Sequence, residues 1–193
     1  MLELLHRHGC MPLSGKKILD VGCGTGTWLR DFIAWGAEPS GVRGVELLPA
    51  SVARARRLCP DGVAIECGTA AELRFPSRSF DIVLQATLLS SVPDSDTRQE
   101  IAAEMLRVVR PEGLILWYDV VVENPWNSCV HPLHRSEIRQ LFPGCSLELH
   151  RVGLTSQIAR FLAPRSWRAS SILSALPPFS THYLGAIRPS LPE

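Results

Sequence analysis

The most constraining feature of this sequence is a short apolar run that ends in three closely spaced glycines and is followed by a helical segment. Ile18 to Val21 is typical of a buried strand, and it runs into Gly22-Cys23-Gly24-Thr25-Gly26. Glycines let a strand-to-helix turn approach a bound molecule without side-chain clashes. The helix that follows, from Thr27 to Trp35, offers unpaired N–H groups in its first turn. The pattern predicts a βα unit with a ligand site at the end of its strand.

The same alternation of apolar runs and helical segments continues along the chain. Four more strands are predicted, at Gly41–Leu47, Val63–Cys67, Phe80–Ala86 and Leu114–Val122. Helices are predicted from Pro49 to about Leu58 and from Thr97 to Val109, and Pro111-Glu112-Gly113 is expected to break the second of these. Five strands alternating with helices predict an open, doubly wound parallel sheet with its ligand beyond the carboxyl ends of the strands.

Length and composition bound the kind of protein. The 193 residues suffice for one domain, and 46% of them are hydrophobic and 20% charged, which is ordinary for a globular chain. A formal net charge of +1 gives no reason to expect nucleic acid as a partner. No apolar run is long enough for a transmembrane helix, and no signal peptide is recognisable. The six cysteines lack the spacing of a zinc site, so no bound metal is expected. Scattered reduced thiols predict a cytoplasmic protein.

The spacing of the glycines indicates which ligand the turn holds. Glu46 lies twenty residues beyond Gly26, at the end of the second strand, where a carboxylate can accept both ribose hydroxyls of an adenosine. A dinucleotide site needs G-x-G-x-x-G or a final alanine, but Thr27 occupies that last position. The G-x-G-x-G spacing therefore favours a nucleoside without phosphates. A dinucleotide, or a glycine-rich turn without any ligand, are the alternatives.

Four segments in order resemble the class I S-adenosylmethionine-dependent methyltransferases, of the bacterial small-molecule type. The first is the glycine-rich segment above, and the second is Gly44-Val45-Glu46-Leu47. The third is Gly68 to Pro76 followed by Ser79-Phe80-Asp81-Ile82-Val83, and the fourth is Leu106 to Gly113. The resemblance covers about residues 15–120 and implies that this part is the cofactor-binding core of a single domain, residues 1–193.

The resemblance also implies roles for individual residues toward S-adenosylmethionine. Glu46 would take the ribose diol, and Leu47 would lie against the adenine. Thr69 and Ala70 would sit at the adenine edge, although position 69 is usually an aspartate in the family. Gln85 would lie where the fourth strand meets the methionine amino group. The methionine and ribose side would be held by the glycine-rich segment, namely Asp20, Gly22, Cys23, Gly24 and Gly26.

In the family fold the sheet has seven strands, mostly parallel, with an antiparallel last strand. Here the sixth strand is expected at Leu147–Leu154 and the seventh at Thr181–Ile187, after a short helix at His134–Phe142. The connection between the last two strands, residues 155–180, is long and apolar. It is predicted to form two short helices that roof the acceptor pocket, and a dimer contact or a membrane-surface helix are the alternatives.

Three residues past the fifth strand are candidates for the base that some acceptors need. His131 and His134 belong to an acceptor-side loop at residues 123–135, and either imidazole could remove a proton near neutral pH. The alternative is that they cap the helix at Arg135. Asp119 could act directly or could end its strand through local hydrogen bonds. In the same loop, Trp126 could stack on an acceptor ring or anchor the loop.

The predicted function is methyl transfer from S-adenosylmethionine to a small-molecule acceptor by in-line displacement. An RNA or protein methyltransferase, or a catalytically silent S-adenosylmethionine-binding partner subunit, are the alternatives. A homodimer is compatible with the sequence. Three arginines on the third helical segment are interpreted as a solvated face, namely Arg54, Arg56 and Arg57.

Overall fold

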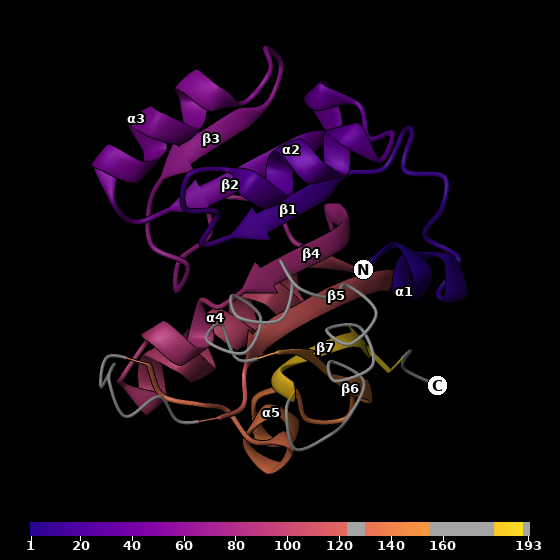
Figure 1. The fold of residues 1–193 in the computed structure, drawn as a ribbon, viewed down its shortest axis with the longest axis vertical. Helices are drawn as coiled ribbons and strands as arrows, with labels where there is room; N and C mark the ends of the chain where they lie inside the picture. Colours follow the sequence, from indigo (N-terminus) through magenta and orange to yellow (C-terminus); the bar gives the residue numbers. More distant parts are fainter. Residues whose placement is uncertain (123–129, 155–179, 191–193) are drawn as a thin grey trace, which may run out of the picture.

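Seven strands form one sheet in the order β3-β2-β1-β4-β5-β7-β6 (Figure 1). The computed structural model describes residues 1–122, 130–154 and 180–190. Strands β1 to β5 pair in parallel, whereas β7 runs antiparallel to both of its neighbours, β5 and β6. The predicted seven-stranded sheet with an antiparallel last strand is therefore confirmed. The strands are β1 (Ile18–Val21), β2 (Val42–Glu46), β3 (Ala64–Cys67), β4 (Phe80–Ala86), β5 (Val109–Val120), β6 (Ser146–Leu154) and β7 (Ser180–Arg188).

Helices cover both faces of the sheet, as its connections require. One hydrophobic core contains buried residues of α1, α2 and α3, and the other contains buried residues of α4 and α5. The α-helices are α1 (Leu2–Arg7), α2 (Thr27–Ala34), α3 (Pro49–Leu58), α4 (Ser95–Val108) and α5 (Arg135–Leu141), and two short 3₁₀ helices are η1 (Pro39–Gly41) and η2 (Leu89–Ser91).

Strand β5 shows how the two cores divide. Leu114 and Leu116 pack into the core of α1 to α3, whereas Ile115 and Trp117 pack into the core of α4 and α5. All four are fully buried, as expected for a strand inside a sheet that is covered on both faces. Because neighbouring side chains point to opposite faces, the next two residues of β5 also lie on different faces of the sheet.

The start of β5 differs from the sequence prediction. Pro111-Glu112-Gly113 was expected to separate the helix from the strand, but β5 begins directly after α4, at Val109. The three residues lie in a bulge of four, residues 110–113, because the register moves from Phe80–Val109 to Ile82–Leu114. Asp81 stabilises this bulge by ion pairing with Arg110. The proline thus fits a strand at a place where the regular ladder is interrupted.

The ends of α4 and α5 depend on side chains that precede them. Asp94 caps α4, since its Oδ2 accepts a hydrogen bond from the backbone N–H of Thr97 at 2.7 Å. The helix therefore begins at Ser95, two residues before the predicted start. At α5, His134 is the residue before the first turn, and its backbone N–H donates to Glu137 Oε2 at 2.9 Å. The predicted start of that helix at His134 is one residue early.

The two ends of the long connection before the last strand lie together. Leu154, the last residue of β6, pairs with Ser180, the first residue of β7. Because β6 runs in the same direction as β1 to β5, this pair lies at the carboxyl edge of the sheet, as predicted. The predicted helical cap at 155–180 lies, apart from Ser180, outside the described residues. Residues 123–129 of the predicted acceptor-side loop, which include Trp126, also lie outside them.

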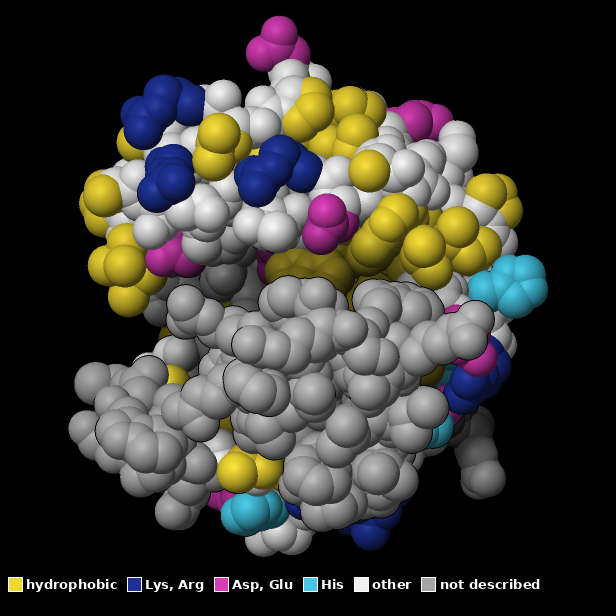
Figure 2. Space-filling model, in the orientation of Figure 1, with side chains coloured by type: hydrophobic (Ala, Val, Ile, Leu, Met, Phe, Trp, Pro, Cys, Tyr) yellow, Lys and Arg dark blue, Asp and Glu magenta, His cyan; other side chains and the backbone are white. Residues whose placement is uncertain are grey.

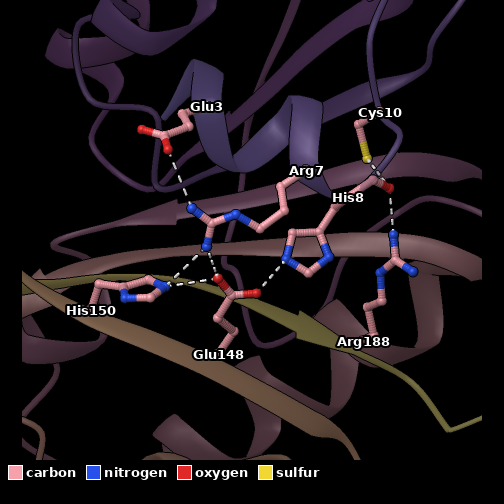
Figure 3. Close-up of polar contacts among 7 residues, drawn as sticks. All are labelled: Glu3, Arg7, His8, Cys10, Glu148, His150 and Arg188. Carbon is pink, nitrogen blue, oxygen red and sulfur yellow. Dashed lines mark hydrogen bonds and ion pairs between the residues drawn. The ribbon is translucent and has the colours of Figure 1, made fainter.

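Helix α1 is fixed to β6 by a charged cluster centred on Glu148 (Figure 3). The carboxylate of Glu148 pairs with Arg7, and it lies 2.9 Å from His8 Nε2 and 2.7 Å from His150 Nε2. The hydrogen bonds with His150, His8 and Arg7 lower the pKa of Glu148 to about 2. Arg188 of β7 donates to the carbonyl oxygen of His8. The first helix therefore lies against the last two strands, at the end opposite the arrowheads of β1, β2 and β4 (Figure 1).

Basic side chains gather on the surface over α3 (Figure 2). Arg54, Arg56 and Arg57 are all exposed, and the guanidinium of Arg56 also donates two hydrogen bonds to the carbonyl oxygen of Ile65, at 3.1 and 2.6 Å. The interpretation of a solvated face thus fits all three arginines, and Arg56 in addition fixes α3 to β3. Within the three described stretches, no helix has the length and apolar character needed to cross a membrane.

Candidate functional site

The glycine-rich turn between β1 and α2 is held against β2. Gly22, Gly24 and Gly26 have φ values of 75°, 53° and 77°, in the left-handed region that favours glycine. The backbone N–H groups of Gly22 and Cys23 both donate to the carbonyl oxygen of Val45, at 2.8 and 3.0 Å. These bonds place the turn beside the end of β2.

The three glycines meet different surroundings. A Cβ atom at Gly22 would lie 2.9 Å from Leu88, and one at Gly26 would lie 2.6 Å from the sulfur of Cys59. In the described part of the chain, no atom lies within 4 Å of the corresponding position at Gly24. The first and third glycines are therefore required by packing inside the protein, whereas Gly24 faces open space. This is the point at which a ligand can reach the backbone of the turn.

Cys23, between the first two glycines, points into the protein. It is 6% exposed, and its sulfur would lie 2.7 Å from a Cβ atom at Gly44. Burial raises the pKa of the Cys23 thiol, so the side chain is neutral and packs as a small apolar group. Its place among the cofactor-binding residues stays a prediction.

Two carboxyl groups lie at the carboxyl edge beside this turn. Asp20 of β1 is 1% exposed, and among the described residues neither of its oxygens has a hydrogen-bond partner. Burial, together with the charge of nearby Glu46, raises the pKa of Asp20 to about 8. A buried carboxyl without a partner is unfavourable unless another group supplies the missing interaction. Asp20 is thus suited to meet a cationic or hydrogen-bonding ligand.

Glu46 is positioned by the backbone around it. Its Oε2 accepts from the N–H of Gly24 at 3.0 Å, and its Oε1 accepts from the N–H of Leu48 at 2.9 Å. The side chain is partly exposed. Each carboxylate oxygen has a second lone pair, so a pair of ribose hydroxyls could still donate to it. The structure brings Asp20, Glu46 and Gly24 together, as the sequence predicted.

The predicted adenine side of the site lies after β2 and β3. Leu47 is 65% exposed, which is unusual for a large apolar side chain and leaves a flat ring room to pack on it. Thr69 is exposed, and its hydroxyl accepts from the N–H of Ala71 at 3.2 Å. Ala70 is half-buried against the core. Leu47, Thr69 and Ala70 all follow strands that end at the same edge as β1, so their predicted role is sterically feasible.

Gln85 and Asp119 lie on the face of the sheet that α4 and α5 cover. Gln85 is fully buried, and its Oε1 accepts from the N–H groups of Leu88 and Leu89 at 3.3 and 3.5 Å. Asp119 is also fully buried, and its oxygens accept from the N–H groups of Ser90 at 3.1 Å and Val120 at 2.8 Å. Burial raises the pKa of Asp119. These contacts favour the interpretation in which Asp119 orders the strand end and η2, and a direct catalytic role stays a prediction.

The two candidate histidines of the acceptor-side loop have different surroundings. The backbone N–H of His131 donates to the carbonyl oxygen of Ser90 at 2.7 Å, so His131 lies beside η2 at the carboxyl edge. His134 is exposed at the start of α5, which agrees with the alternative of a helix-capping residue. The structure thus places the backbone of His131 beside η2, which follows β4.

Three aromatic rings that the sequence analysis did not select lie on the opposite face from Asp119. The rings of Tyr118 and His182 stack at 4.8 Å with an interplanar angle of 3°. The ring of Trp28, two residues after the glycine-rich turn, meets Tyr118 edge-on at 5.9 Å. Trp28, Tyr118 and His182 are all partly exposed. On this face, apolar side chains gather around α2 (Figure 2).

Burial affects the titration of two of these rings in opposite directions. It raises the pKa of Tyr118 and lowers the pKa of His182, because each charged form is disfavoured away from water. Both rings are therefore neutral near pH 7. His182 Nδ1 lies 2.9 Å from the hydroxyl of Thr181. The pairing of Tyr118 with His182 depends on the antiparallel register of β5 and β7, so no local sequence signal indicates it.

Comparison with known proteins agrees with this geometry. A family model described as a methyltransferase domain matches residues 18–113, which contain the glycine-rich turn, Glu46 and Gln85. The chain belongs to the class I S-adenosylmethionine-dependent methyltransferases. A solved S-adenosylmethionine-dependent methyltransferase from Mesorhizobium loti has a TM-score of 0.64 and 20% identity, over 97% of this chain and 98% of that one. At that identity the likeness shows the shared fold.

Curated relatives of this methyltransferase chain match it over only part of their own length. It is 30% identical to a phthiotriol/phenolphthiotriol dimycocerosates methyltransferase of Mycobacterium ulcerans over 142 residues, covering 72% of this chain and 51% of the relative. It is 36% identical to a 2-methyl-6-phytyl-1,4-hydroquinone methyltransferase of Synechocystis over 109 residues, covering 54% of this chain and 32% of the relative. The chain thus spans about half the length, or less, of these curated relatives.

The residues present fit the cofactor of this methyltransferase family. S-adenosylmethionine carries an ammonium group and a sulfonium centre, and the buried Asp20 carboxyl lacks a partner among the described residues. Gly24 faces open space, and Glu46 lies within hydrogen-bond reach of that turn. When bound, the cofactor supplies a methyl group on a positively charged sulfur. The described stretches contain no group of three His, Cys, Asp or Glu residues that could hold a metal ion.

Proposed function

We propose that this chain transfers the methyl group of S-adenosylmethionine to a small-molecule acceptor. One observation carries the proposal: the buried Asp20 carboxyl has no hydrogen-bond partner among the described residues, and it lies near Glu46, which accepts from the N–H of Gly24. A buried neutral carboxyl with a raised pKa ionises when a cation is placed next to it. The cationic methionine end of the cofactor is such a partner, and the ribose diol matches the acceptor oxygens of Glu46.

In this proposal the protein acts mainly by alignment. Methyl transfer is an in-line displacement, so the acceptor atom must face the methyl carbon opposite the sulfur. The cofactor-binding core is residues 15–120, and the acceptor approaches over the carboxyl ends of β4 and β5. Asp119 and Gln85 hold η2 in place through backbone N–H groups, and His131 is fixed to η2 through Ser90. These residues thus act as positioning groups at the acceptor side.

The class of acceptor is supported by what relatives are named for. Those quoted above are named for phthiotriol-type lipids and for a substituted hydroquinone, and a third relative, from Bacillus licheniformis, for demethylmenaquinone. Each name denotes a small molecule. A small-molecule acceptor is therefore our proposal for this chain as well.

The experiment measures cofactor binding and methyl transfer separately. Binding of S-adenosylmethionine is measured by calorimetry for the wild type, for Glu46→Ala and for a matched control, Glu66→Ala, on the neighbouring strand β3. We expect Glu46→Ala to weaken binding at least tenfold and Glu66→Ala to leave it unchanged. The protein is then incubated with methyl-labelled cofactor and a metabolite extract, and labelled products are identified by mass spectrometry. Absence of cofactor binding by the wild type would contradict the proposal, and label found only in protein or RNA would exclude a small-molecule acceptor.

A further inference from the structure

We propose that His182 and Tyr118 form the acceptor subsite, that it takes an aromatic alcohol of the phenol or hydroquinol class, and that His182 is the base that removes its proton. This inference rests on the proposed function, because it places an acceptor beside the bound cofactor. It concerns different residues from those that hold the cofactor.

Position in the sheet is the first argument. Tyr118 pairs with Ala86 at the carboxyl end of β4, and β4 lies next to β1, which carries Asp20. Tyr118 and Asp20 also lie on the same face of the sheet, the face covered by α2. Through Leu84 of β4, Asp20 is level with Leu116 of β5. Tyr118 lies two positions beyond Leu116, closer to the carboxyl edge of the sheet. An acceptor that meets a methyl group over the end of β4 therefore lies next to Tyr118.

The second argument is the continuity of the aromatic surface. Gly26 ends the glycine-rich turn, and Trp28 follows it by two residues. The ring of Trp28 contacts the ring of Tyr118. Tyr118 in turn stacks on His182. All three rings are partly exposed, although the neighbouring residues Trp117 and Asp119 are fully buried. A row of partly exposed rings favours a planar acceptor, because aromatic groups stack or meet edge-to-face.

The third argument is the hydrogen bonding of His182. If Nδ1–H donates to the Thr181 hydroxyl 2.9 Å away, Nε2 carries the free lone pair. A base whose second nitrogen is fixed by a hydrogen bond is the usual arrangement for proton removal by histidine. Among the described residues, Tyr118 on β5 and both His150 and Glu148 on β6 are titratable groups that share its face on the adjoining strands. Tyr118 is neutral near pH 7, and His150 is paired with Glu148.

The reaction step then balances as follows. The acceptor O–H proton moves to His182 Nε2, and a lone pair of the acceptor oxygen forms a bond to the methyl carbon. The carbon–sulfur bond breaks with its electron pair on sulfur, which leaves S-adenosylhomocysteine as a neutral thioether. His182, now an imidazolium, releases the proton to solvent.

The test uses 2-naphthol as the probe and the full chain saturated with S-adenosylhomocysteine. Calorimetry should show that the wild type binds 2-naphthol and that Tyr118→Leu weakens this binding at least tenfold. The saturated analogue decahydro-2-naphthol should bind the wild type more weakly than 2-naphthol does. Tyr183→Leu is the matched control. Tyr183 follows His182 in β7 and points to the opposite face of the sheet, where Arg151 lies over its ring. Equal effects of the two tyrosine substitutions, or no binding of 2-naphthol to the wild type at millimolar concentration, would overturn the subsite.

The role of His182 has a spectroscopic readout that does not depend on turnover. The imidazole proton signal of His182, assigned by its loss in His182→Gln, should shift when 2-naphthol binds, whereas that of His131 should not. With labelled cofactor, His182→Gln should lower kcat for naphthol methylation about 100-fold or more while cofactor affinity is unchanged. A shift of His131 in place of His182, or normal turnover in His182→Gln, would overturn the assignment. Failure of the wild type to bind S-adenosylhomocysteine would instead count against the proposed function.

Discussion

Replacing Asp20 by asparagine should stabilise the ligand-free protein while weakening its cofactor binding. Asparagine has nearly the same shape as a protonated aspartate, so the folded state changes little. The unfolded state changes more, because an unfolded aspartate ionises and becomes hydrated, whereas asparagine cannot. The substitution therefore removes a free-energy gain that the wild type obtains only by unfolding.

The pKa of Asp20 sets the magnitude and the sign of this effect. The folded carboxyl keeps its proton up to about pH 8, whereas the ordinary value is 3.8. Between these values the folded state binds more protons than the unfolded state, so the free energy of unfolding falls as the pH rises. The loss is about 1.4 kcal/mol per pH unit, or about 4 kcal/mol at pH 7. Below about pH 4 the contribution of Asp20 to stability is fully retained, and above about pH 8 the loss levels off.

Urea denaturation of the cofactor-free protein at pH 5, 6, 7 and 8 measures this directly. We expect the stability of Asp20→Asn to exceed that of the wild type by an amount that grows with pH. Asp61→Asn, at an exposed aspartate in the turn before β3, is the control and should show no such growth. At pH 8, Asp20→Asn should also bind S-adenosylmethionine about tenfold or more weakly, because one charge-assisted interaction is lost. A difference in stability that does not change with pH would refute the assignment of a raised pKa to Asp20.

Three further predictions follow from other contacts. Glu148→Gln should lower the free energy of unfolding by about 1 kcal/mol at pH 7, since one partly exposed charged acceptor is lost from the cluster around α1. Because the pKa of Glu148 is lowered to about 2, this stabilisation is present above about pH 4.5, and urea curves of the two proteins should converge as the pH falls toward 2. Gly24→Val should abolish cofactor binding in calorimetry while circular dichroism shows a folded sheet, because the side chain would enter the open space beside the turn. Methyl transfer should be insensitive to a chelator, and loss of activity that magnesium restores would contradict this.

The cofactor side of the site could be predicted from the sequence because its signals are local. The glycines and the acid at the end of the second strand are fixed by short spacings, and parallel strands place their carboxyl ends at one edge. Asp20 and Glu46 therefore lie together as expected. Local patterns do not show that Asp20 lacks a hydrogen-bond partner among the residues that the structure describes, because this depends on everything packed around it.

The acceptor side was harder to predict because it depends on long-range pairing. Tyr118 and Asp119 are neighbours in the chain but lie on opposite faces of the sheet. This difference of face makes Asp119 a buried structural carboxyl and Tyr118 a partly exposed ring. The partner of Tyr118 lies 64 residues later in the chain and reaches it only through the antiparallel pairing of β5 with β7. The bulge at Pro111 also escaped prediction, since a proline between a helix and a strand normally indicates a break.

The position of β7 between β5 and β6 has a consequence for how the chain folds during synthesis. Strand β6 is made before β7, yet in the described sheet it pairs with β7 alone. Until residues 180–188 leave the ribosome, β5 presents an open hydrogen-bonding edge next to its buried apolar residues. Exposed edges of this kind pair readily with other chains. A nascent or truncated chain that lacks β7 should therefore be prone to aggregate and to engage chaperones, even though its cofactor-binding half is already complete.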